Sequence, residues 1–188
     1  MAEVVIGNVI ATYEIRGRNV VLMCPPHPLF GGSRHDVRLD RISNALLRLG
    51  ISVLRFDYMR PYRGGIGEIE DAKKCLSYLK DRHDFIIVLG YSFGSVVASN
   101  IARYCDLSIY ISPIRAIDSI KFTDTKIPKL FIIATKDQII PLQESLEIYE
   151  EASEPKAIVK LETDHFYFGK FDALSKAVVD YIKSNIEI

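Results

Sequence analysis

The sequence has no surplus of charge of either sign, because 24 Lys and Arg residues balance 24 Asp and Glu residues in a chain of 188. A basic surplus is the usual footprint of nucleic-acid binding, so we expect no nucleic-acid partner. No apolar run is long enough to cross a bilayer, and the first residues lack the basic, apolar and small-residue regions of a signal peptide. We therefore expect no membrane association and no export signal.

Cysteine is also scarce, and the motifs that hold cofactors are missing. Cys24, Cys75 and Cys105 are an odd number without metal-ligand spacing, as expected for reduced core thiols in a cytoplasmic protein. The stretch "GGIGEIE" (64–70) lacks the third glycine of a dinucleotide fingerprint, and no phosphate-binding G-K-[ST] occurs. The histidines do not show metal-ligand spacing either, so we expect neither an organic cofactor nor a metal.

Short apolar runs alternate with helix-period segments along the chain. The length favours one domain over residues 1–188, and 48% hydrophobic with 26% charged residues is typical of a globular protein. Runs rich in Val and Ile, apolar on both faces, predict strands after an N-terminal hairpin around Gly7, at 20–24, 52–56, 85–89, 107–111, 129–134 and 157–161. Helices are predicted at 36–50, 67–80, 93–104, 142–152 and 171–186.

This alternation predicts an α/β fold, with a doubly wound, mostly parallel sheet that carries helices on both faces. Sites in such sheets form outside the C-terminal ends of the strands. Ser33, with Asp36 three places on, predicts a capping box at the start of the first helix. The segment 112–128 leaves room for a short helix at most, so we expect an open site without a lid.

The stretch "GYSFG" (90–94) places a serine between a buried strand and a helix. A turn this tight strains the serine and lifts its side chain clear of the sheet edge, and it leaves space only for small residues at Gly90 and Gly94. The five-residue pattern alone is a weak signal, since about one random chain of this size in fifteen contains it. Its position at a strand–helix junction favours Ser92 as a nucleophile.

A serine nucleophile needs a base, and the base needs an acid that orients it. His165 is the one histidine that follows Ser92, and it lies just after the last predicted strand. Asp137 lies three residues past the preceding strand, so both residues are expected at the sheet edge of Ser92. Asp164 is a weaker candidate for the acid, because a residue adjacent to His165 in sequence cannot easily orient its ring.

The sequence also predicts two backbone donors for an oxyanion. One is the N–H of Phe93, the residue after the serine, and the other comes from the loop "PPHPLFGGS" after the third strand. Position in that loop indicates Leu29, two places past His27, since proline has no N–H to donate. His27 either holds the loop shape by hydrogen bonds or acts directly in catalysis, and we favour the first.

Together, "HPLFGGS", "VLRFDY", "GYSFGS", "KDQIIP" and "DHFYFG" resemble the α/β-hydrolase superfamily over nearly the whole chain. The chain is most similar to the small, capless branch related to dienelactone hydrolases and carboxylesterases. The resemblance implies an eight-stranded, mostly parallel sheet and a Ser92–Asp137–His165 triad. The dienelactone branch commonly has Cys at the nucleophile position, so Ser92 argues against that activity.

These features predict a serine hydrolase that cleaves a small carboxylic ester and needs a small-molecule substrate as its only partner, with an oligomer possible but not indicated. An acyl-protein or acyl-CoA thioesterase, a peptidase, and a non-catalytic binding protein on the same fold are the alternatives. "FYF" (166–168) either packs in the core or lines an acyl pocket. The sequence leaves open the roles of five residues near the site: Tyr58, Arg60, Tyr62, Arg63 and Arg115.

Overall fold

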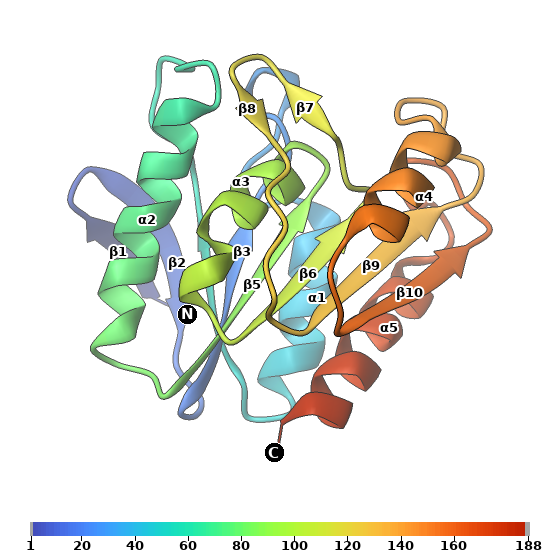
Figure 1. Ribbon diagram of the computed structural model, residues 1–188. Helices are drawn as coiled ribbons and strands as arrows, with labels where there is room; N and C mark the ends of the chain where they lie inside the picture. The colour runs from blue at the N-terminus through green and yellow to red at the C-terminus, as the bar shows by residue number, and fades with distance from the viewer. Residues whose placement is uncertain (1, 187–188) are drawn as a thin grey trace.

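Eight strands form one sheet in the order β1-β2-β4-β3-β5-β6-β9-β10 (Figure 1). The computed structural model describes residues 2–186. The strands are β1 (Ala2–Ile6), β2 (Val9–Glu14), β3 (Asn19–Cys24), β4 (Ser52–Phe56), β5 (Phe85–Tyr91), β6 (Leu107–Ile111), β9 (Lys129–Ala134) and β10 (Lys156–Leu161). Within this sheet β2 alone runs against the others. The predicted mostly parallel sheet of eight strands is confirmed.

Helices cover both faces of this sheet (Figure 1). On one face lie α2 (Ile66–Lys80), α3 (Phe93–Ile101) and α4 (Leu142–Glu151), and on the other lie α1 (Val37–Leu47) and α5 (Phe171–Asn185). Two single turns of 3₁₀-helix, η1 (Pro28–Phe30) and η2 (Ala102–Tyr104), follow β3 and α3. The two layers of helices explain why the strands are apolar on both sides.

The central strand β3 shows how this burial follows from the sequence. Val20, Leu22 and Cys24 pack into the core shared with α2 and α3, whereas Val21 and Met23 pack into the core shared with α1 and α5. Successive side chains of a strand point to opposite faces, so an uninterrupted apolar run fills both cores. Burying each such side chain contributes about 1.5–3 kcal/mol.

The predicted cap of the first helix was wrong, and two other segments differ in detail from the sequence pattern. The N-cap of α1 is Asp36, whose carboxylate accepts the N–H groups of Arg38 and Leu39, and Ser33 is not the cap. The predicted helix 93–104 ends as an α-helix at Ile101 and continues as η2. The segment 112–128, which was expected to hold a short helix at most, forms a small antiparallel hairpin, β7 (Ala116–Ile117) and β8 (Ile120–Lys121).

Candidate active site

Ser92 stands at the turn between β5 and α3 with φ 55° and ψ −120°, a conformation that is strained for a residue with a side chain. The flanking glycines are required by close backbone contacts. A Cβ on Gly90 would lie 2.0 Å from the carbonyl oxygen of Gly94, and a Cβ on Gly94 would lie 2.1 Å from that of Cys24. The turn is therefore clamped between its own helix and the loop after β3.

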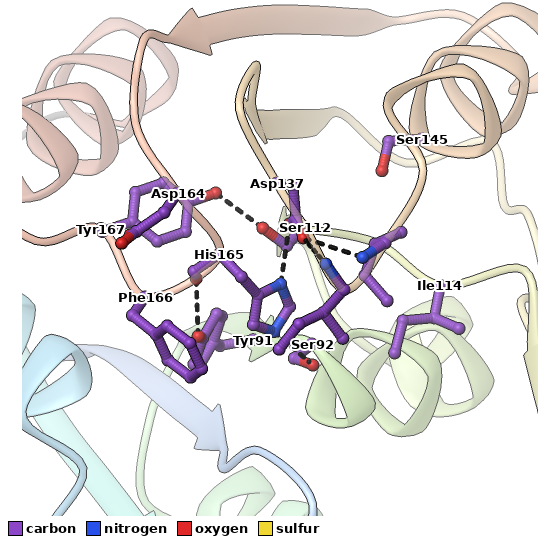
Figure 2. A network of polar contacts seen from close by, with 12 residues as sticks. Tyr91, Ser92, Ser112, Ile114, Asp137, Ser145, Asp164, His165, Phe166 and Tyr167 are labelled. Atoms are coloured by element: carbon purple, nitrogen blue, oxygen red, sulfur yellow. Dashed lines mark hydrogen bonds and ion pairs between the residues drawn. The ribbon is translucent and has the colours of Figure 1, made fainter.

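The structure brings the three predicted triad residues together (Figure 2). His165 Nε2 lies 3.1 Å from Ser92 Oγ, and His165 Nδ1 lies 2.7 Å from Asp137 Oδ2. The side chains of His165 and Asp137 are only 5% and 4% exposed, so water competes little for the bond between them. Each residue lies in a loop after a different strand: β5, β9 or β10.

Asp137 is held so that one of its oxygens faces the imidazole. Oδ1 accepts the backbone N–H groups of Ile139 and Ile140, both at 2.8 Å, which leaves Oδ2 for His165. Burial raises the pKa of Asp137, but the hydrogen bonds from His165 and the two backbone N–H groups outweigh it, and the pKa lies below its ordinary value. The rival Asp164 instead accepts the N–H of Phe168 at 3.2 Å.

Two further residues hold the backbone of the histidine loop, and neither was predicted. The Tyr91 hydroxyl donates to the carbonyl oxygen of His165 at 2.8 Å (Figure 2). The Arg38 guanidinium lies 4.7 Å from the centre of the Tyr91 ring and donates to the carbonyl oxygen of Phe166 at 3.4 Å. Tyr91 lies within "GYSFG", so its place beside Ser92 could be read from the sequence. Nothing in the sequence around Arg38 links it to a loop 128 residues away.

The two predicted oxyanion donors have different surroundings. Phe93 is the first residue of α3, and an N–H in the first turn has no partner inside its helix. The N–H of Leu29 donates to His27 Nδ1 at 3.2 Å, so His27 shapes the loop by hydrogen bonding as expected. Gly31 has φ 84°, and a Cβ on Gly32 would lie 2.1 Å from the carbonyl oxygen of Pro26. Both glycines are thus needed for this loop to fold.

The residues whose roles the sequence left open are largely engaged inside the protein. The buried Tyr58 donates to the carbonyl oxygen of Pro25 at 3.1 Å. Arg63 forms ion pairs with two fully buried carboxylates, Glu68 at 3.8 Å and Asp71 at closer range. Both Tyr58 and Arg63 therefore stabilise the loop between β4 and α2.

Arg60, Arg115 and Tyr62 have three different kinds of surroundings. Arg60 is exposed. Arg115 bridges the chain after β6 to α4, with ion pairs to Glu147 at 3.6 Å and Glu151 at 2.8 Å. Tyr62 contacts the ring of His27, with 4.7 Å between the ring centres.

Exposed apolar side chains lie in the loop that carries His165 and in the loop after β3. Tyr167 is fully buried, which confirms core packing for the middle of "FYF", but Phe166 and Phe168 are 40% and 67% exposed. The loop after β3 adds Leu29 and Phe30, the latter 86% exposed. The rings of Phe166 and Phe30 lie 5.6 Å from His165 and 5.0 Å from His27, respectively. We call Leu29, Phe30, Phe166 and Phe168 the apolar rim.

Residues 2–186 contain no group of three or more His, Cys, Asp or Glu side chains placed to hold a metal ion. None of the helices in this range has both the length and the hydropathy to cross a bilayer. The three cysteines are buried and unpaired. Burial raises the pKa of Cys105 to about 12, so this thiol stays protonated and unreactive near neutral pH.

A serine turn after β5, an aspartate after β9, a histidine after β10 and only a small hairpin between β6 and β9 are the arrangement of the α/β-hydrolase fold without a lid. Solved structures match almost the whole chain. The α/β serine hydrolase without lid XC6422 from Xanthomonas campestris has a TM-score of 0.84 and 20% identity, covering 96% of this chain and 90% of that one. The esterase Pf2001 of Pyrococcus furiosus has a TM-score of 0.81 and 19% identity, covering 97% and 91%.

Sequence comparison finds a relative at a similarly low level of identity. No family model matches the chain. An uncharacterized protein of Rickettsia prowazekii (strain Madrid E) is 23% identical over 185 residues, covering 87% of this chain and 78% of that protein. At these levels of identity the comparisons establish the fold, and the chemistry of the site has to be argued from its own residues.

Proposed function

We propose that this protein is a serine hydrolase that cleaves small carboxylic esters through an acyl-enzyme. The hydrogen-bonded chain from Ser92 through His165 to the buried Asp137 carries the proposal, because this arrangement makes a serine hydroxyl nucleophilic. The names of the two solved neighbours, a serine hydrolase and an esterase, support the same class.

In the first half of the reaction, Ser92 Oγ bonds to the carbonyl carbon while its proton passes to His165 Nε2. The carbonyl electron pair moves onto oxygen and forms an oxyanion. When this intermediate collapses, the bond to the alkoxide breaks, and the alkoxide takes the proton from His165 and leaves as the alcohol. Asp137 keeps the ring proton on Nδ1 and stabilises the imidazolium.

In the second half, His165 takes a proton from a water molecule, whose oxygen attacks the acyl carbon. Collapse breaks the bond to Ser92 Oγ, which recovers its proton and releases the carboxylic acid. In both halves, the N–H groups of Phe93 and Leu29 are the proposed donors to the oxyanion. Losing one such donor typically costs 10²–10³-fold in kcat.

The substrate class follows from the openness of the site. The chain between β6 and β9 forms only a short hairpin, and the apolar rim is largely exposed, so a small acyl group has contacts while a long one projects into water. A thioesterase or peptidase would use the same triad. The three buried, unpaired cysteines favour a reducing, cytoplasmic compartment.

Labelling with a fluorophosphonate, followed by turnover of p-nitrophenyl acetate, tests the proposal. We expect the wild-type protein to be labelled and to hydrolyse the ester, and Ser92→Ala to lose both while keeping its thermal transition. Ser184→Ala, at an exposed serine near the end of α5, is the matched control and should keep both. Full ester turnover by Ser92→Ala would refute the proposed mechanism. A wild-type protein that is neither labelled nor active would favour the alternative of a non-catalytic binding protein. Parallel assays with acyl-CoA and peptide substrates separate the hydrolase classes.

A further inference from the structure

Three loops that are distant in sequence meet at the ring of His27. The ring centre lies 4.7 Å from that of Tyr62, in the loop between β4 and α2, and 4.7 Å from that of Phe93 at the start of α3. His27 Nε2 lies 3.9 Å from Oδ2 of Asp118, at the tip of the β7–β8 hairpin. The Tyr62 hydroxyl donates to the same oxygen of Asp118. The hairpin that replaces a lid therefore reaches the loop that carries Leu29.

The two nitrogens of His27 have different tasks in this cluster. Because the Leu29 N–H is a donor, Nδ1 must accept, and the ring proton then lies on Nε2, which faces Asp118. Burial lowers the pKa of His27, although Asp118 acts in the opposite direction, so the ring is neutral near pH 7 and Nδ1 keeps its lone pair. At 3.9 Å the contact is longer than a hydrogen bond, so Asp118 acts through its negative charge, which favours a proton on the nitrogen that faces it.

We propose that Asp118 is a positioning residue, which selects the Nε2–H tautomer of His27 and thereby fixes the amide of Leu29 at the edge of the active site. This inference rests on the proposed hydrolase function, in which that amide donates to the oxyanion. At 3.2 Å the bond to Nδ1 is at the long end of the normal range, so the N–H can be shared with a second acceptor. Asp118 itself touches no reacting group.

A direct catalytic role for His27 does not fit this geometry. His27 is only 8% exposed. Its polar contacts are with Leu29 and Asp118, whereas the hydrogen-bond partner of Ser92 Oγ is His165. The loop also packs directly on the nucleophile turn, since Gly94 lies against the carbonyl oxygen of Cys24. A shift of the His27 loop therefore alters the space beside Ser92.

Kinetics of two variants and their combination test the proposal. Asp118 has φ 49°, which asparagine tolerates, so Asp118→Asn keeps the turn. We expect it to lower kcat for p-nitrophenyl acetate about tenfold, a part of the loss for a missing oxyanion donor, with KM within about twofold. In His27→Asn, the asparagine oxygen can still accept the N–H of Leu29. An asparagine has no tautomers, so Asp118 no longer has a proton position to select. Adding Asp118→Asn to His27→Asn should then change kcat less than twofold. Ser119→Ala, in the same turn, is the control with unchanged kcat.

A second readout needs no substrate. ¹⁵N-resolved NMR of the His27 ring should show the Nε2–H tautomer in the wild type and a mixture in Asp118→Asn. The role of Asp118 would be overturned if Asp118→Asn and His27→Asn lowered kcat by independent factors that multiply in the double variant. A ring proton on Nδ1 of His27 in the wild type would overturn it as well. A wild type that does not react with fluorophosphonate refutes the hydrolase function instead, whereas a changed tautomer with unchanged kcat refutes only the positioning role.

Discussion

Replacing Asp137 with asparagine exchanges one carboxylate oxygen for an NH₂ group of similar size. The structure determines how the new amide would turn. The N–H groups of Ile139 and Ile140 both donate to Oδ1 at 2.8 Å, so the asparagine oxygen takes that place and its NH₂ faces His165 Nδ1. A donor at that position forces Nδ1 to accept, and the ring proton moves to Nε2, toward Ser92. The imidazole can then no longer take the proton of the serine.

The size of the effect follows from this tautomer change. In a Ser-His-Asp triad, the wrong tautomer lowers kcat about 10⁴-fold, which corresponds to about 5 kcal/mol of transition-state stabilisation at 1.36 kcal/mol per tenfold. Because the substitution leaves the apolar rim untouched, we expect KM for p-nitrophenyl acetate to stay within about threefold.

Asp164→Asn is the matched control, because Asp164 precedes His165 but bonds to the N–H of Phe168, a bond that asparagine can also accept. Its kcat should stay within about threefold of the wild type. Steady-state kinetics of the two variants, with circular dichroism to verify folding, decide the question. A loss below tenfold for Asp137→Asn, or a larger loss for Asp164→Asn, would mean that the acid is misassigned.

Three further predictions concern the turn, the loop beside it and access to the site. Gly94→Ala places a Cβ 2.1 Å from the carbonyl oxygen of Cys24, so urea unfolding should show a loss of about 2–4 kcal/mol, and an unchanged midpoint would contradict the close contact. Arg63→Met removes the nearest cation from the buried Glu68 and Asp71, of which Asp71 keeps Lys74 at 3.4 Å, and should cost about 3 kcal/mol in the same assay, the low end for breaking a buried pair. In a p-nitrophenyl ester series, kcat/KM should be highest between acetyl and hexanoyl, because longer chains gain little of the ~0.8 kcal/mol per buried CH₂; a rise up to palmitoyl would refute the open site.

The strands and the approximate places of the triad could be predicted because their signals are local. Val and Ile runs buried on both faces show the strands directly, and Asp137 and His165 each follow a strand by a few residues. Parallel strands end at one edge of the sheet, so their order along the chain is enough to expect them beside Ser92.

The contacts around the triad could not be predicted, because they depend on the angles at which separate loops leave the sheet. The approach of Asp118 to His27 joins segments 91 positions apart, and no pattern within either segment indicates it. The helix cap shows the same difficulty at short range. Ser33 and Asp36 are both good cap residues, but the Ser33 hydroxyl accepts the N–H of His35 at 3.2 Å, while Asp36 caps α1.

The backbone contact between Gly90, Gly94 and Cys24 has a consequence for changing this protein in the laboratory. The turn that carries Ser92 is built from main-chain atoms in contact, where no added side-chain atom fits, so libraries that vary these positions would yield mostly misfolded proteins. The apolar rim is built from side chains that point outward from two loops. Randomising the rim alone offers a way to select new substrate preferences while the reacting groups keep their geometry.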